Sequence, residues 1–160
     1  MSLKEKVLQD LNIVIKEGKE LEALVLRQLS AAILNKEKEK RYRIFKEKSE
    51  EKTENLTDEE TVEVVSAEAK KRKEAIPEYE KGERQDLVEK EKKELEILQK
   101  YLPEQLSEEE IKKLAKETIE KVGAKEIKDT GKVMAELMPQ VKGKAEGGQV
   151  GQIVKELLES

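Results

Sequence analysis

Apolar residues recur at intervals of three and four along most of the chain, and this spacing constrains the fold more than any other feature. The first two stripes are Leu3, Val7, Leu11 and Val14, and then Val25, Leu29, Ala32 and Ile33. Such spacing places the apolar side chains on one face of an α-helix. No segment shows the two-residue alternation that is typical of a half-buried strand. The sequence therefore predicts an all-α protein.

Two capping boxes mark the starts of predicted helices. Thr57 is followed three residues later by Glu60, and Ser107 is followed in the same way by Glu110. In this arrangement the hydroxyl and the carboxylate each accept a hydrogen bond from a backbone amide that has no partner within the helix. We therefore expect one helix to begin at Thr57 and another at Ser107.

The segment between these two starts predicts a helical hairpin. Its first helix reaches about Lys81, and Gly82 is expected to end it in the left-handed conformation. Its second helix runs from about Glu83 to Leu102, because Pro103 disfavours helical geometry in the residue before it. Together with the two earlier stripes, these helices are expected to form an antiparallel bundle or a pair of hairpins.

The chain beyond the hairpin differs in composition from the part before it. Six of the eight glycines lie between Gly123 and Gly151, and three short apolar stripes follow Ser107. We predict an N-terminal helical bundle domain over residues 1–103 and a small three-helix domain over residues 104–160.

The composition excludes several kinds of chemistry. The chain has no histidine and no cysteine, which removes His-dependent nucleophile systems, ordinary structural zinc sites and disulfides. It also has no phosphate-binding loop and no dinucleotide-binding motif, so we expect no catalytic residue, no cofactor and no metal. The N-terminus lacks the apolar core of a signal peptide, and no apolar run approaches the about 20 residues that span a bilayer. We therefore expect a cytoplasmic protein that does not contact a membrane.

Clusters of basic residues raise the possibility of nucleic-acid binding despite an acidic balance. The formal net charge is −4, and the two predicted domains carry −2 each (23 basic and 25 acidic residues, then 10 and 12). Two clusters fall on predicted helices: residues 36–48, with seven basic and three acidic residues around Tyr42 and Phe45, and the run Lys70–Lys73. For both we favour solvated helix faces over phosphate contacts.

A third basic cluster lies in the predicted tail domain. Lys132, Lys142 and Lys144 accompany a glycine-rich loop that includes Gly143 and Gly147. Lysines contact phosphates, and glycines let a ligand approach the backbone closely. From the sequence, phosphate contact and a simple helix-ending loop are equal interpretations, and these five residues are the candidate nucleic-acid site.

Two charged residues interrupt the apolar stripes of the predicted hairpin. Arg72 lies in the stripe of the first helix, and Glu91 lies in that of the second. If Gly82 lies at the centre of the turn, these two residues face each other. We predict a partly buried salt bridge that fixes the register of the hairpin, with the alternative that Arg72 reaches the surface on its long stem.

Several stretches of the chain match known motifs. The most specific are YLPEQLS at 101–107, GKVM at 131–134 and LMP at 137–139. With these strings the chain resembles the GatB/YqeY family, small helical proteins related to the tail of the aspartyl/glutamyl-tRNA amidotransferase B subunit. Compared with that family, Lys144 replaces a usual Arg, and residues 41–55 resemble an enlarged connector.

The resemblance implies a helical bundle followed by a three-helix tail, and it also implies a function. In the B subunit the similar tail engages tRNA while other domains perform glutamine-dependent amidation, and similar domains are appended to glutaminyl-tRNA synthetase. The chain is too short to hold an ATP-using domain and an amidase as well, so we expect a non-catalytic module that binds tRNA or another structured RNA. One alternative is an accessory component of a carbon–nitrogen ligase with glutamine as amido-N-donor, whose partner is an amidotransferase or an aminoacyl-tRNA synthetase. The other alternative is a protein–protein interaction bundle with no role in RNA binding.

Overall fold

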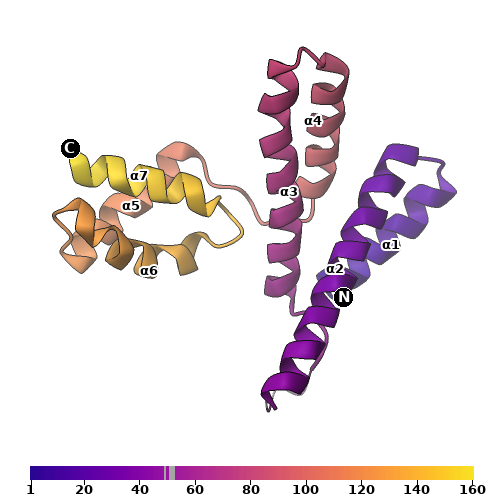
Figure 1. Cartoon of the computed structure of the whole chain (residues 1–160), viewed down its shortest axis with the longest axis horizontal. Helices are drawn as coiled ribbons and strands as arrows, with labels where there is room; N and C mark the ends of the chain where they lie inside the picture. Colours follow the sequence, from indigo (N-terminus) through magenta and orange to yellow (C-terminus); the bar gives the residue numbers. More distant parts are fainter. Residues whose placement is uncertain (49, 51–52) are drawn as a thin grey trace. The chain divides into compact units, whose positions relative to one another are not determined.

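The computed structural model describes residues 1–48, 50 and 53–160, and over these residues it contains seven α-helices, one short 3-10 helix and no strand (Figure 1). The predicted all-α class is therefore confirmed. The chain divides into two compact units, Met1–Leu102 and Pro103–Ser160, each with its own apolar core.

The N-terminal unit consists of two helical hairpins. Its helices are α1 (Leu3–Lys16), α2 (Glu20–Glu47), α3 (Asp58–Lys81) and α4 (Gln85–Gln99). Short turns join α1 to α2 and α3 to α4, and the two helices of each pair lie side by side (Figure 1). Helix α2 also packs against α3 and α4. The centre of this core includes Val7, Val25, Leu29, Ile33, Val65 and Leu98.

The predicted capping boxes are present at both helix starts. The Thr57 hydroxyl accepts a hydrogen bond from the Glu60 amide at 3.1 Å, and the Glu60 carboxylate accepts one from the Thr57 amide at 2.7 Å. Ser107 and Glu110 form the same pair of bonds, at 3.2 and 2.7 Å. A further box, between Ser2 and Glu5, begins α1. The sequence analysis missed this box although it has the same spacing.

The end of α3 differs from the prediction for Gly82. This glycine has φ −82°, and the left-handed residue is Glu83, with φ 54°. The Glu83 amide donates to the Glu80 carbonyl at 3.1 Å, and the Arg84 amide donates to the Tyr79 carbonyl at 3.0 Å. This is the Schellman arrangement, in which the left-handed residue follows the helix cap. The hairpin turn is therefore centred one residue later than predicted.

Helix α2 is longer than the family resemblance implied. It continues to Glu47, so residues 41–47 of the expected connector are helical. Residues 49 and 51–52 of that connector lie outside the described part of the chain.

The C-terminal unit is a cluster of three helices with one 3-10 turn. Its elements are α5 (Glu108–Val122), η1 (Ile127–Asp129), α6 (Thr130–Val141) and α7 (Gly147–Glu159), and each α-helix packs against the other two. The core consists of Ile111, Ala115, Val133, Leu137, Val141, Val150 and Val154, with Ala124 and Ile153. Gly123 ends α5 with φ +69°, a conformation that glycine adopts without strain.

In the described part of the chain, no helix combines the length and the apolar character needed to cross a membrane.

Candidate functional site

The loop between α6 and α7 is held in one conformation by the segment that precedes α5. The Gly143 carbonyl accepts a hydrogen bond from the Gln105 side chain, and the Lys144 carbonyl accepts one from the Leu106 amide, both at 2.8 Å. Gly143 has φ +76°, and the Lys144 amide turns back to the Val141 carbonyl. The loop therefore presents the Lys142 and Lys144 side chains from a fixed backbone, and both are exposed.

The charges around this loop favour an anion. Lys144 has no carboxylate within ion-pair distance in the described part of the chain, whereas Lys142 takes part in a polar interaction. Helix α7 starts directly after the loop, and no side chain caps its N-terminus. The first backbone amides of a helix carry partial positive charge and bind phosphate groups.

The glycines at the start of α7 are not required by packing. A Cβ on Gly147 would lie 3.6 Å from the Met138 methyl group, and one on Gly151 would lie 3.8 Å from the Met134 methyl group, both ordinary contact distances. A Cβ on Gly148 would meet nothing within 4 Å. Glycine in a helix costs about 0.5–1 kcal/mol relative to alanine. The sequence thus gives up helix stability here without a gain in packing.

Lys132 lies away from this loop. It belongs to the first turn of α6, whereas Lys142 follows the last turn, so the rise of the helix separates them by about 15 Å. Lys132 lies near Asp129, whose pKa is lowered chiefly by hydrogen bonds from the Lys125 and Glu126 amides and also by the Lys132 charge. The structure thus brings together four of the five predicted residues, Lys142, Gly143, Lys144 and Gly147, at one end of α6.

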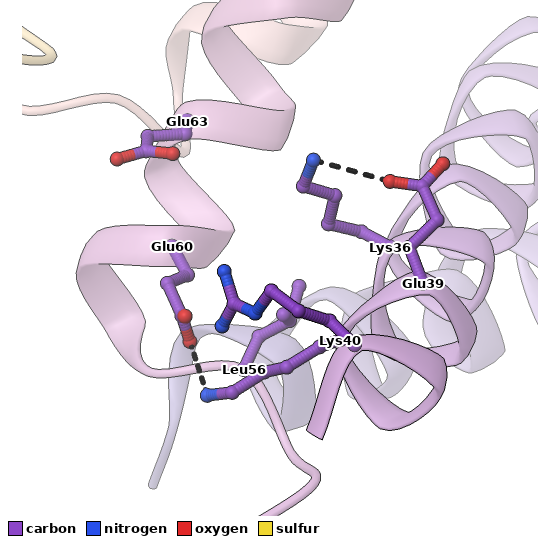
Figure 2. A pocket seen from close by; sticks show the side chains of 7 residues that line it. Lys36, Glu39, Lys40, Leu56, Glu60 and Glu63 are labelled. Atoms are coloured by element: carbon purple, nitrogen blue, oxygen red, sulfur yellow. Dashed lines mark hydrogen bonds and ion pairs between the residues drawn. The ribbon is translucent and has the colours of Figure 1, made fainter. Parts of the chain in front are cut away.

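The basic stretch 36–48 forms the C-terminal half of α2, and part of it is consumed by ion pairs. Lys40 is 5% exposed; its ammonium donates to the Glu60 carboxylate at 2.8 Å and to the Asn55 carbonyl at 3.0 Å. Lys36 pairs with Glu39 at 3.2 Å, and Figure 2 shows both pairs in the pocket between α2 and α3. Hydrogen bonds from Lys40 and from the Thr57 amide lower the pKa of Glu60.

This pocket does not favour a small-molecule ligand. Its volume is 260 Å³, below the about 300–1,000 Å³ that is usual for such sites. Its remaining charged residues, Arg43 and Glu63, each take part in a polar interaction. The cluster therefore reads as an internal ion-pair network that joins α2 to α3.

Burial of charge in this part of α2 escaped the sequence analysis. Glu37 is buried and holds the Lys4 ammonium of α1 at 2.8 Å, and Lys40 is buried against α3. The signal was present, because Ile33, Glu37 and Lys40 continue the three-and-four spacing of the apolar stripe.

The run Lys70–Lys73 is also largely structural. Lys70 lies 3.8 Å from Glu74, and Lys71 lies 2.8 Å from Glu68. Arg72 is 8% exposed and donates to Glu68 and to Gln28, both at 2.7 Å. Burial of Arg72 fits its predicted structural role, and it does not reach the surface.

The carboxylate that Arg72 meets on α4 is Glu94 and not Glu91. The Arg72 Nε lies 3.5 Å from the Glu94 Oε2, while the structure forms no ion pair between Arg72 and Glu91. The predicted partner is one helical turn away from the observed one, because the hairpin turn is centred on Glu83. Burial, and then the nearby Glu94 charge, raise the pKa of Glu91.

The described residues include no group of three or more acidic side chains that could hold a metal ion. The fold and the loop define a small all-α protein with an N-terminal bundle of two hairpins and a three-helix tail. The chain belongs to the Yqey-like protein family, whose sequence model matches residues 4–158. A comparison with curated proteins finds no match.

Proposed function

We propose that this protein is a non-catalytic module that binds tRNA or a similar structured RNA through the α6–α7 loop. The observation that carries the proposal is the coincidence, at one end of α6, of exposed Lys142 and Lys144 with an uncapped helix start built from Gly147 and Gly148. Lysines and helix N-termini are the groups that fix a protein on a phosphate backbone. The resemblance of the tail to the tRNA-engaging tail of the amidotransferase B subunit points in the same direction.

The glycines give this proposal a physical reason. A phosphate that approaches the first amides of α7 needs space where side chains would stand, and Gly148 leaves that space open. A site of this kind keeps glycine at a cost in helix stability. Binding and stability should therefore respond in opposite directions to the same substitution.

The first test is a charge reversal with a matched control. The double variant K142E/K144E should weaken binding of total tRNA by about tenfold or more at low salt, because two phosphate contacts are lost. The control, K125E/K132E, changes the charge equally on exposed lysines that have no ion pair in the described part of the chain. It should leave the affinity within about twofold, whereas equal loss in both variants would show binding to net charge and contradict the proposed site.

The second test separates a binding glycine from a structural one. The substitution Gly148→Ala should raise the urea midpoint of unfolding, since a helical position gains an alanine. In the same protein it should weaken tRNA binding. Unchanged binding by the more stable variant would remove the α7 N-terminus from the site.

A further inference from the structure

Helix α2 carries a second exposed surface that the proposed loop does not include. Tyr42 is 66% exposed and Phe45 is 82% exposed. At 100° per residue these two rings lie on one side of the helix together with Lys38 and Arg41, within an arc of about 100°. We call Lys38, Arg41, Tyr42 and Phe45 the aromatic face of α2.

This face belongs to a stretch that has cations available. Lys38, and Lys46 and Lys48 at its border, form no ion pair within the described part of the chain, while Arg41 pairs with Glu54 at 2.7 Å. Residues 36–48 hold seven basic and three acidic side chains. A partner of this face must therefore be anionic and must offer planar or apolar groups to the two rings.

We propose that the aromatic face of α2 stacks on unpaired bases of a single-stranded RNA segment while Lys38 and its neighbours contact the phosphates. The inference rests on the proposed association with RNA and adds the type of nucleotide that is recognised. Proteins that bind single strands combine cations along the backbone with aromatic side chains on which the bases stack. Tyr42 and Phe45 are one helical turn apart, so each ring reaches a different base.

A second copy of this chain is a poorer partner for the same face. Leu34 and Arg27 continue the face toward the start of α2. A parallel pairing of two copies would place Lys38 against Lys38, and an antiparallel pairing centred on Leu34 would place Arg27 against Arg41. Like charges at facing positions oppose helix pairing.

A lipid surface also fits less well. Helices that lie in a membrane interface insert a broad apolar face. The apolar face of α2, which includes Val25, Leu29 and Ile33, is already buried in the core of the N-terminal unit. Only the two rings remain for insertion.

The test uses a single tryptophan in the full-length chain, which has none of its own. The variant F45W replaces an exposed ring and should fold as the parent does. Addition of the single-stranded oligonucleotide U12 should quench its fluorescence without a blue shift, because the indole stacks on a base. A fully paired RNA duplex of the same length should quench it at least fivefold less at equal concentration.

Two variants show whether the rings carry the affinity. Y42A/F45A should weaken U12 binding by about tenfold or more, while the control Leu34→Ala, on the same side of α2, should leave it within about twofold. Equal affinity of Y42A/F45A and the parent, or equal quenching by duplex and single strand, would overturn the inference. A blue shift with phosphatidylglycerol vesicles but no response to U12 would indicate a membrane surface and would overturn it as well.

The outcome is independent of the α6–α7 loop. If K142E/K144E weakens tRNA binding while U12 leaves the F45W emission unchanged, the proposed function stands and this inference fails. If neither loop nor aromatic face responds to RNA, both fail together.

Discussion

Replacing Arg72 with methionine should strongly destabilise the N-terminal unit. The guanidinium joins three helices: it donates to Glu68 on α3 and to Gln28 on α2, both at 2.7 Å, and lies 3.5 Å from Glu94 on α4. The side chains of Arg72, Glu68 and Glu94 are only 10%, 12% and 7% exposed. Methionine fills much of the same space but leaves both carboxylates without this cation.

The expected magnitude follows from that burial. Removing one partner of a buried ion pair costs about 3–5 kcal/mol, because a charge remains buried without compensation. Glu68 keeps Lys71 at 2.8 Å, so we expect the lower end, about 3 kcal/mol. For a domain of this size each kcal/mol lowers the melting midpoint by about 4–8 °C. The N-terminal unit should therefore melt about 12–24 °C lower.

Thermal melts followed by circular dichroism measure this change, and Arg84→Met is the matched control. Arg84 donates two hydrogen bonds to Asp86, both at 3.1 Å, but the two side chains are 59% and 65% exposed. Exposed ion pairs contribute little to stability, so this control should melt as the parent does. Equal midpoints for Arg72→Met and Arg84→Met would refute the reasoning.

The same assay distinguishes the two carboxylates of α4. Glu94→Gln should lower the melting midpoint at pH 7, because it removes a charge that faces Arg72. Glu91→Gln should leave the midpoint unchanged or raise it. Burial and the Glu94 charge raise the pKa of Glu91, so its ionised form is disfavoured in the folded protein. The reverse ranking would restore the register predicted from the sequence.

Three further substitutions test local features. The Tyr101 hydroxyl donates to Asp10 at 2.7 Å, and burial, followed by this hydrogen bond, raises the pKa of Tyr101. The native protein should therefore lose stability as the pH rises above about 10, and Tyr101→Phe should reduce this alkaline loss in urea titrations. Gly143→Ala should destabilise the C-terminal unit by about 1–2 kcal/mol in urea unfolding, because φ is +76° there. Ser107→Ala should cost about 1 kcal/mol in the same assay, because the capping box of α5 is lost.

Local signals allowed the sequence to predict helix starts, whereas helix ends required the structure. The hydroxyl and carboxylate of a capping box are four residues of contiguous chain, so Thr57 and Ser107 could be read directly. At the end of α3 a glycine is available, yet the left-handed residue is Glu83. That one-residue difference moved the partner of Arg72 from Glu91 to Glu94.

The candidate site was predicted in composition but not in extent. Lys132 and Lys142 both adjoin glycines in the sequence, but a straight helix lies between them and holds them about 15 Å apart. In the basic stretch of α2, the charge count could not reveal that Lys40 is buried against Glu60 while Phe45 is exposed. Which cations are consumed depends on contacts between α2 and α3, and those contacts are long-range.

The salt dependence of tRNA binding tests the central claim most directly. The affinities of the parent and of K142E/K144E for total tRNA are measured between 50 and 200 mM salt, about the range over which phosphate contacts weaken strongly. Each lost phosphate contact reduces the slope of log affinity against log salt by about 0.7–0.9. The account predicts a slope that is flatter by about 1.5–2 in the variant. Parallel slopes, or no binding by the parent at the lowest salt concentration, would contradict it.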